Sequence, residues 1–293
     1  PRTGDDAVMS TVITCGERAL DLSQPTIMGV LNVTPDSFSD GGQLYQGAAL
    51  SPSLLLKRAE QMVLDGARLL DVGGESTRPG ATPVSESEEL DRVLGAVEAL
   101  THHVDAVISV DTSTPSVMTQ SARLGAGLLN DVRGFRRAGA LEAASATGLP
   151  LCIMHMQGEP DTMQQNPQYN DVLSGVRDFF NGRLSACQAA GISQDRIILD
   201  PGFGFGKTAE HNFHLLAHLG ELCLTEHPIL VGLSRKSMIA SVLEKAPEER
   251  VFASVALALM AVERGASIVR VHDVAATADA LAMWGALPRS TDR

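Results

Sequence analysis

The feature that most constrains this chain is a repeated unit: a short apolar run, a polar residue at its end, a loop, and a stretch with helical periodicity. Helical patterns follow most of the runs, for example at residues 53–65, 87–100, 171–190 and 248–264. Strands that alternate with helices form parallel sheets, and eight such units predict a (β/α)8 TIM barrel. The eight runs are residues 26–31, 69–72, 106–110, 127–129, 151–154, 197–199, 229–233 and 267–271.

The length of 293 residues would allow one large barrel or two smaller domains. No change of composition marks a boundary, so we expect a single domain over residues 1–293. A doubly wound parallel sheet is the alternative architecture. Ahead of the first unit, two short apolar pieces within residues 12–22 predict an N-terminal β-hairpin.

Composition excludes several classes of function. A net charge of -12 argues against nucleic acid as a partner, and an anionic substrate would need local basic residues. The longest apolar run, residues 255–262, is too short to cross a bilayer, and no signal peptide is visible. The cysteines lie far apart with no C-x-x-C pair, which is typical of reduced thiols, so we expect a cytoplasmic protein. They are Cys15, Cys152, Cys187 and Cys223.

Residues 196–207 contain the most distinctive loop, D-P-G-F-G-F-G-K, directly after an apolar run. A P-loop would need a glycine where Pro201 stands, and G-x-G-x-G is one residue shorter than the Rossmann fingerprint. Asp200 ends the run, and three glycines then let a ligand approach the backbone closely. A turn whose glycines serve steric needs alone is the simpler interpretation, but the same pattern recurs at other strand ends.

A polar residue closes every one of the eight apolar runs. The carboxyl ends of barrel strands all open onto one face, where ligands of α/β proteins bind. We therefore expect one site built from these positions. They are Asn32, Asp71 with Glu75 nearby, Asp111, Asn130 with Asp131, His155, Asp200, Ser234 with Arg235 and Lys236, and Arg270 with His272.

These side chains form two chemical sets. Asp111, Asn130 and Asp200 offer oxygens that suit a flat heterocycle with adjacent N–H donors, such as an aminopyrimidinone, and Lys236 adds a donor. The second set is basic or rich in oxygen. Arginine forks suit phosphate oxygens, and an asparagine oxygen suits Mg²⁺, which takes few protein ligands. This set consists of Asn32, Thr77, Arg78, Arg270 and His272.

Long motifs surround these positions. They include I-M-G-V-L-N-V-T-P-D-S-F-S-D-G-G (27–42), L-L-D-V-G-G-E-S-T-R-P-G (69–80), S-V-D-T (109–112), N-D-V (130–132), M-H-M-Q-G (154–158), D-P-G-F-G-F-G-K (200–207), S-R-K-S (234–237) and R-V-H-D-V (270–274). In this order they resemble the motifs of the bacterial dihydropteroate synthase family, and the resemblance covers a core of about residues 12–286.

The resemblance implies a reaction in which the amine of 4-aminobenzoate displaces diphosphate from 6-hydroxymethyl-7,8-dihydropterin diphosphate. The product is 7,8-dihydropteroate, a folate precursor. The family also implies Mg²⁺ as cofactor and a homodimer, and it is the target of sulfonamide drugs, which resemble aminobenzoate.

The resemblance also implies a role for each motif residue. The pterin would be held by Asp111, Asn130, Asp200 and Lys236, in a pocket lined by Met154, Phe205 and Gly232. Asn32 would bind Mg²⁺, and the diphosphate would be bound by Arg270 and His272 with Thr77 and Arg78 closing over it. The aminobenzoate would lie among Phe38, Pro79 and Ser237. The residues expected to act in catalysis are Asp111, Asp200, Lys236, Arg270 and His272.

Several alternatives stay open. A pterin-binding methyltransferase domain would share the heterocycle set but would not need the diphosphate set, and a catalytically silent protein could keep the pocket alone. Two long loops, residues 33–47 and 74–83, are rich in Gly, Pro and Ser and are expected to act as lids. Asp40 on the first loop could stabilise positive charge on the pterin. Lys207 could contact phosphate or pair with a neighbouring acid, and His155 could support the loop after its strand or a neighbouring site residue; both alternatives stay open for each residue.

Overall fold

The computed structural model describes residues 11–34, 45–46, 49–75, 84–222 and 226–287. Within them, one sheet contains eight strands, and each strand is parallel to its neighbours. The strands are β3 (Thr26–Asn32), β6 (Leu69–Gly73), β7 (Val107–Asp111), β8 (Leu128–Asp131), β9 (Leu151–Met154), β10 (Ile197–Asp200), β11 (Leu230–Val231) and β12 (Ile268–Val271).

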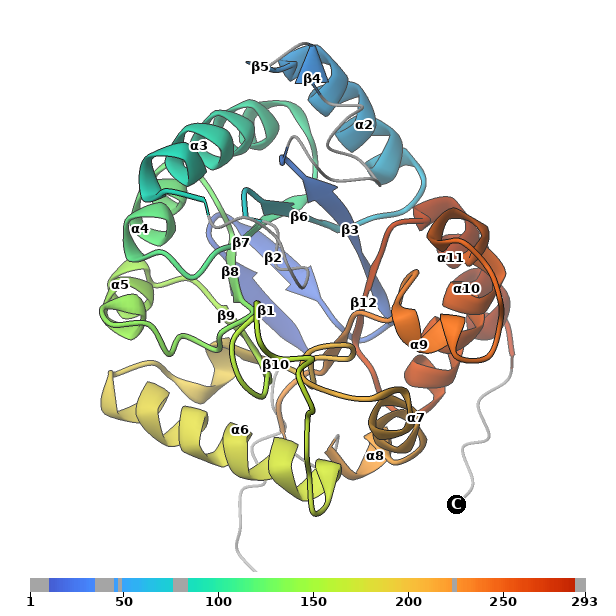
Figure 1. The fold of residues 1–293 in the computed structure, drawn as a ribbon. Coiled ribbons are helices and arrows are strands. Elements are labelled where there is room, and N and C mark those ends of the chain that lie inside the picture. The colour runs from blue at the N-terminus through green and yellow to red at the C-terminus, as the bar shows by residue number, and fades with distance from the viewer. Residues whose placement is uncertain (1–10, 35–44, 47–48, 76–83, 223–225, 288–293) are drawn as a thin grey trace, which may run out of the picture.

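The sheet closes on itself. Its strand order is β10-β9-β8-β7-β6-β3-β12-β11, and a parallel bridge between Leu199 and Ile229 joins the first strand to the last. Figure 1 shows the resulting barrel with the helices around it. The predicted (β/α)8 barrel is therefore confirmed, and the doubly wound alternative, which would leave two open sheet edges, is wrong.

The helices cover the outside of the barrel and bury one face each against it. Among the described residues they are α2 (Pro52–Leu64), α3 (Glu86–His103), α4 (Pro115–Arg123), α5 (Ala140–Thr147), α6 (Val172–Ala189), α7 (Ala209–Ala217), α8 (Leu219–Leu222), α9 (Ser237–Ala240), α10 (Val251–Glu263) and α11 (Val274–Gly285). Short 3₁₀ turns precede two elements, η1 (Gln194–Arg196) and η2 (Pro247–Glu249).

The helix beginnings show why these segments are helical. Before α3, Ser85 Oγ accepts from Glu88 N and Glu88 Oε2 accepts from Ser85 N, which is a reciprocal capping box. Acidic residues fill the first turn of α3 and histidines fill the last, so both ends complement the helix dipole. Thr208 caps α7 in the same way, because its Oγ1 accepts from His211 N at 3.2 Å.

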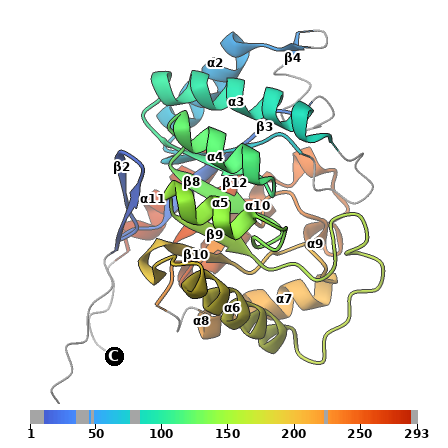
Figure 2. The same ribbon diagram turned by 90° about the vertical axis from the view of Figure 1, so that its left-hand side faces the viewer.

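The predicted N-terminal hairpin is also present. Strands β1 (Val12–Cys15) and β2 (Arg18–Asp21) pair antiparallel. Their buried side chains Ile13, Cys15 and Leu20 pack against the inner cluster of the barrel. Figure 2 shows the hairpin at one end of the barrel, with α9 and the segment between β9 and α6 at the opposite end. The hairpin therefore covers the amino-terminal end of the barrel. A second short pair, β4 (Tyr45–Gln46) and β5 (Ala49–Leu50), was not predicted.

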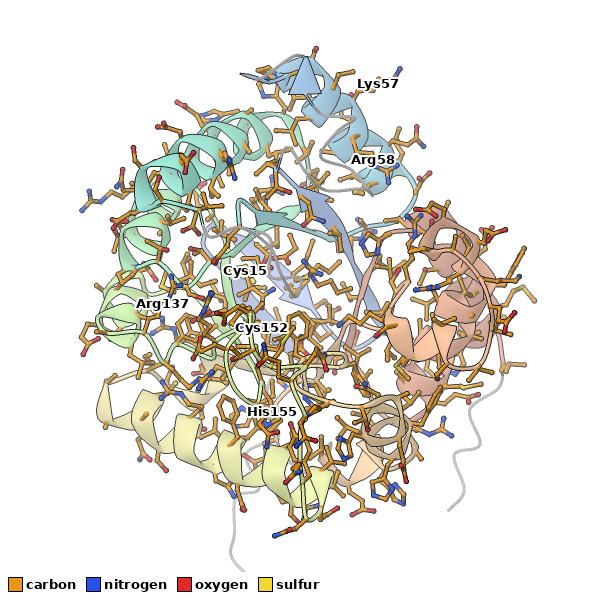
Figure 3. All side chains as sticks on the ribbon, in the orientation of Figure 1. Cys15, Lys57, Arg58, Arg137, Cys152 and His155 are labelled. Atoms are coloured by element: carbon orange, nitrogen blue, oxygen red, sulfur yellow. The ribbon has the colours of Figure 1, made fainter. Side chains whose placement is uncertain are left out.

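The barrel interior is layered. The first layer takes one apolar side chain from each strand: Met28, Leu69, Val107, Leu128, Cys152, Ile198, Leu230 and Ile268. Figure 3 shows Cys152 close to the barrel axis. Side chains alternate along a strand, so the next inward positions lie two residues further on. This second layer is Val30, Asp71, Ser109, Asn130, Met154, Asp200, Gly232 and Arg270, and it is mostly polar. The polar layer faces the end opposite to the hairpin and forms the base of the candidate site.

Candidate active site

An arginine in the second layer pairs with two carboxylates. Arg270 Nε donates to Asp71 Oδ2 at 2.7 Å, and Arg270 Nη2 lies 3.6 Å from Asp111 Oδ2. Asp71 is fully buried and also accepts from Ser109 Oγ at 2.6 Å and from Asn130 Nδ2 at 3.1 Å. Its partners come from β12, β7 and β8, so the cluster fixes the relative positions of four strand ends.

Burial and charge set the protonation of the two carboxylates above this base. Burial raises the pKa of Asp111 well above its usual value, Asp71 adds to the rise, and Arg270 opposes it. Burial also raises the pKa of Asp200, while Lys236, the N–H of Gly202 and Arg270 act in the opposite direction. Buried carboxylates whose charge depends on nearby donors are suited to bind a ligand that supplies further N–H groups.

Asn130 presents an acceptor toward the same space. Its Nδ2 is held by Asp71, which fixes the orientation of the amide. Its Oδ1 is buried and has no hydrogen-bond partner within the described part of the chain. A buried acceptor without a partner is uncommon in a folded protein. We interpret it as a position at which a ligand N–H completes the hydrogen bonding.

A lysine reaches the site from the turn after β11. Lys236 Nζ donates to the carbonyl of Phe203 and lies 4.8 Å from the centroid of the Phe205 ring. Burial lowers the pKa of Lys236 to about 8, Asp200 opposes the change, and Arg270 adds to it. A Cβ on Gly232 would lie 3.6 Å from Lys236 Nζ, so the glycine leaves room beside this ammonium group.

One side of the site is apolar. Four buried side chains, Val132, Met154, Met156 and Met163, form a separate cluster with Phe205 packed against them. Thioether side chains adapt to flat ligands and make favourable contacts with aromatic rings. The site therefore combines a charged base with an apolar wall, which is the pattern that a polar heterocycle requires.

Two side-chain oxygens, one from Asn32 and one from Asp111, lie close together at the rim. A Cβ built on Gly73 would lie 3.7 Å from Asp111 Oδ2 and 3.9 Å from Asn32 Oδ1, so both oxygens flank this glycine. An amide oxygen and a carboxylate suit Mg²⁺, which usually keeps waters and substrate phosphate oxygens as its other ligands. No group of three or more His, Cys, Asp or Glu residues with metal-binding geometry occurs in the described ranges. An amide oxygen and a carboxylate oxygen suit magnesium better than zinc, which favours nitrogen and sulfur ligands.

His272 follows directly after the last barrel strand, β12, next to this rim. Its backbone N–H donates to Ser234 Oγ at 3.3 Å, and its Nδ1 lies 3.0 Å from the same hydroxyl. This contact orients the imidazole and joins the ends of β12 and β11.

The turn that carries Lys236 is held from several sides. Arg235 has a left-handed φ of 61°, a conformation that favours glycine or asparagine. Its side chain makes a two-pronged pair with Asp273, with Nε–Oδ2 at 3.0 Å and Nη2–Oδ1 at 2.5 Å. Its N–H donates to Ser254 Oγ, and its carbonyl accepts from Arg250 Nη1 at 2.9 Å. These contacts offset the backbone strain and fix where Lys236 projects.

A second arginine joins four loops on the same face. Arg133 forms a bidentate pair with Glu75, with Nη1–Oε2 at 3.1 Å and Nη2–Oε1 at 3.2 Å. It also donates to Ser113 Oγ at 2.9 Å and to Glu159 at 3.3 Å. The loops after β6, β7, β8 and β9 are therefore connected through one buried guanidinium group.

The glycine loop after β10 packs tightly against the loop after β9. Gly202 has a φ of 68°, and a Cβ there would lie only 1.8 Å from the carbonyl oxygen of His155. Gly206 has a φ of 60°, and a Cβ there would lie 2.4 Å from the carbonyl oxygen of Gln157. Glycine is thus required at both positions by backbone conformation and by space.

This packing gives a stability prediction. We expect Gly202→Ala to lower the free energy of unfolding by more than about 2 kcal/mol, because the added methyl group meets backbone in a left-handed conformation. Gly95→Ala is the matched control: it lies within α3, where an added methyl group meets nothing within 4 Å. It should raise stability by about 0.5–1 kcal/mol. Urea denaturation measures both, and equal midpoints for the two variants would contradict the prediction.

The structure gathers most of the predicted site residues at one end of the barrel. The described ones there are Asn32, Asp111, Asn130, Met154, Asp200, Phe205, Gly232, Lys236, Ser237, Arg270 and His272. Ser237 begins α9, a helix of only four residues. Phe38, Asp40, Thr77, Arg78 and Pro79 lie outside the described residues.

Several residues of this region were missed or misread in the sequence. The sequence places Asp71 and Glu75 near the end of one strand, and the structure shows that each pairs with an arginine side chain. The segment 155–171 is a third long loop, and it contributes Met156 and Met163 to the apolar wall. The motif M-H-M-Q-G, rich in methionine at a strand end, was the one available signal for that wall.

Comparison with known proteins is consistent with this geometry. Residues 28–272 match the family described as pterin binding enzyme. The dihydropteroate synthase of Haemophilus influenzae is 51% identical over 269 residues, which cover 92% of this chain and 96% of the relative.

Solved structures are equally similar. That of Yersinia pestis dihydropteroate synthase with a sulfonamide drug has a TM-score of 0.90 and 52% identity, covering 94% of this chain and 98% of that one. The Xanthomonas albilineans dihydropteroate synthase with 4-aminobenzoic acid has a TM-score of 0.87 and 45% identity, covering 95% of this chain and 100% of that one. The chain belongs to the pterin-binding enzyme family and, within it, to the dihydropteroate synthases.

Proposed function

We propose that this chain transfers a dihydropterin-methyl group from 6-hydroxymethyl-7,8-dihydropterin diphosphate to the amine of 4-aminobenzoate, giving 7,8-dihydropteroate and diphosphate. One observation carries the proposal: Arg270 of the diphosphate set lies next to the heterocycle set, with its Nη2 3.6 Å from Asp111 Oδ2. Arg270 belongs to β12, and His272 of the diphosphate set follows directly after that strand. The family and its named relatives support the same reaction.

The pterin is assigned to the base of the site. Asp111 and Asp200 would accept from its N–H groups, and Asn130 Oδ1 would gain the partner that it lacks. Lys236 would donate to a ring carbonyl or nitrogen. Met154, Phe205 and Gly232 are proposed to line the pocket, where the methionine and phenylalanine cover the ring faces and the glycine leaves space beside the ammonium.

The diphosphate is assigned to the rim. Arg270 and His272 would bind its oxygens, and Thr77 and Arg78 would close over it. Asn32, next to Asp111, is proposed to hold Mg²⁺, which when bound would neutralise charge on the phosphate oxygens. The aminobenzoate is assigned to the outer part of the site, among Phe38, Pro79 and Ser237.

The chemistry that follows is a loose displacement. No side-chain nucleophile is needed, because the aromatic amine attacks the methylene carbon directly. As the C–O bond lengthens, negative charge grows on the departing diphosphate beside Arg270 and His272, while positive charge spreads into the pterin beside Asp111 and Asp200. We therefore propose an SN1-like transfer, with Asp40 as a further acid acting on the pterin cation.

A pH dependence follows from Lys236. Its ammonium must be protonated to donate, and its pKa is lowered to about 8. We expect kcat/KM for the pterin substrate to fall as pH rises from 7 to 9, because the donor is lost as pH passes the pKa. In Lys236→Arg the guanidinium stays charged, so the alkaline decline should disappear even if activity is lower. An unchanged decline in that variant would assign it to another group.

The proposal is tested by diphosphate release. Release should require the pterin diphosphate, 4-aminobenzoate and Mg²⁺ together, and mass spectrometry should find dihydropteroate. Binding of the pterin without turnover would instead support a silent binding protein. Methyl transfer from methyltetrahydrofolate would support the methyltransferase alternative, which the sequence allows but which leaves Asn32, Arg270 and His272 without a role.

We also propose that two copies of the chain pair through α10 and α11. Helix α10 has no charged residue before Glu263, and its outer face carries Phe252 (84% exposed) and Met260 (44%). Met283 of α11, the helix packed beside it, is 71% exposed. A helix that is apolar all round is normally buried. Chromatography with light scattering tests the dimer, and Phe252→Glu should yield monomer.

The single domain and the cytoplasmic location remain proposals as well. One main apolar cluster joins the barrel to its helices in the described ranges, which supports a single domain. Cys15, Cys152 and Cys187 are free and buried, which suits a reducing compartment. No helix in the described part of the chain is long and apolar enough to span a membrane.

A further inference from the structure

A second lysine lies beneath the site and takes no part in the reaction proposed above. Lys207 ends the glycine loop, but its side chain is only 3% exposed. Its Nζ donates back to Gly202 O at 2.8 Å and to Phe205 O at 3.1 Å, and lies 2.9 Å from His155 Nδ1. Figure 3 shows His155 between the barrel and α6. Neither a phosphate site nor a direct carboxylate pair, the two possibilities raised by the sequence, accounts for these contacts.

The partners of Lys207 indicate which form of the side chain fits. Burial, followed by the charges of Lys207 and Arg136, lowers the pKa of His155 to about 2, so its ring is neutral. One nitrogen of a neutral ring accepts, and we assign this role to Nδ1, which lies 2.9 Å from Lys207 Nζ. Three acceptors therefore face Nζ. An ammonium group has three N–H donors for them, whereas a neutral amine would turn its lone pair toward one.

These contacts also control the shape of the pocket. Gly202 and Phe205 lie on either side of Phe203, whose carbonyl accepts from Lys236, and the Phe205 ring lies under the same ammonium. By binding both flanking carbonyls, Lys207 fixes the loop that positions Lys236. Lys207 and Lys236 thus bind carbonyls of the same loop.

The charge of Lys207 also affects the pKa of Asp200. Burial raises the pKa of Asp200, and the groups that oppose the rise are Lys236, the N–H of Gly202, Arg270 and Lys207. The pKa of the Cys152 thiol, in the first layer, is raised by burial and further by Asp200, so this thiol stays neutral. Two of the three cations, Lys236 and Arg270, are assigned to substrate. Lys207 is held entirely by protein groups, so its effect on Asp200 persists whatever is bound.

We propose that Lys207 is a positioning residue for the pterin pocket: its buried ammonium braces the glycine loop and keeps Asp200 in the ionised form that accepts from the pterin. The inference rests on the proposed function for the identity of the ligand. Burial disfavours the charged form of Lys207, because it lowers the pKa of this lysine well below its usual value, while Asp200 raises that pKa. The charge state is therefore the point to test.

The first experiment reads that charge in the unmodified protein. The chain has four lysines, Lys57, Lys207, Lys236 and Lys245, so ¹³C,¹⁵N-lysine labelling gives few NMR signals. Lys57 and Lys245 are exposed references, and their replacement by arginine, together with Lys236→Arg, assigns Lys207 by elimination. Cε and Nζ shifts of an ammonium group at pH 7 support the proposal. Shifts of a neutral amine at pH 7 overturn it, and this result does not depend on any variant at Lys207 folding.

The second experiment separates the charge from the brace. In Lys207→Met the acid limb of kcat/KM for the pterin substrate should move to higher pH by about 0.5–1 unit, because Asp200 loses a cation. KM for that substrate should rise about tenfold, equivalent to one pKa unit of interaction, with little change for 4-aminobenzoate. His155→Gln is the matched control, since it disturbs the same loop but keeps the charge, and its acid limb should stay in place.

The outcomes are distinct. An unmoved acid limb in Lys207→Met overturns the proposed effect on Asp200, and equal shifts in both variants reduce Lys207 to a structural brace. Wild-type turnover is measured first. If it is absent, the proposed function fails, while the NMR result still decides whether the buried lysine is charged.

Discussion

Asp200→Asn is expected to lower kcat/KM for the pterin substrate by roughly 30- to 1000-fold, or about 2–4 kcal/mol, the range for a buried charge-assisted partner. The amide keeps the size of the side chain and can still accept from Gly202 N, which now donates to Asp200 Oδ1 at 2.8 Å. It cannot supply the negative charge, and its NH₂ group would face the N–H donors of the pterin.

The fold should tolerate this change. Burial raises the pKa of Asp200, so in the native state at pH 7 the ionised carboxylate is less favourable than in the unfolded chain. Asp200→Asn removes that cost, so we expect a melting temperature at or above that of the wild type. Asp195→Asn, on the exposed turn before the same strand, is the control for activity. Near-normal kinetics in Asp200→Asn would remove Asp200 from the proposed mechanism, and a lower melting temperature would contradict the expected tolerance of the fold.

Arg270→Met is expected to lower both activity and stability. The guanidinium group pairs with Asp71, which is fully buried, and lies 3.6 Å from Asp111. Removing one partner from a buried ion pair leaves a carboxylate uncompensated, at a cost of about 3–5 kcal/mol. Turnover should fall below detection in a standard assay, because the diphosphate would lose its main cation as well.

The stability loss should depend on pH in a definite direction. Without Arg270 the pKa of Asp111 in the folded state rises further, since Arg270 is the group that opposes its rise. A carboxyl group with a raised folded pKa favours the native state at low pH, and that contribution is lost as pH increases through the folded pKa. The deficit of Arg270→Met should therefore be smaller at pH 5 than at pH 8. Arg123→Met, at an exposed position on α4, should show no such dependence in urea denaturation.

Much of the fold could be predicted because the spacing of apolar residues in the sequence matches the positions that the barrel buries. Each barrel strand is a short apolar run that must be buried on both faces, and for β9 the predicted and observed bounds are the same. The site residues could be identified because strand ends converge in a barrel, whatever the distance along the chain. Arg270 and Asp71, 199 residues apart, meet for that reason alone.

The pairing of side chains could not be predicted. Nothing in the sequence indicates that Glu75 pairs with Arg133 or that Lys207 turns back to His155, because these contacts depend on loop conformation. Arg235 gives no signal either, since a left-handed φ is expected at glycine or asparagine and here depends on a pair with Asp273. The segment 155–171 was missed because its residues look like an ordinary connection.

The hairpin at the amino-terminal end has a consequence for the order of events. Because β1 and β2 pack over the first layer, ligands can enter the described part of the barrel only from the opposite end. When a pocket opens at one end only, the ligand that lies deepest must bind first. On the assignments above, that molecule is the pterin diphosphate, and the aminobenzoate follows. The product would then leave through the same opening, and its pterin part would leave the pocket last.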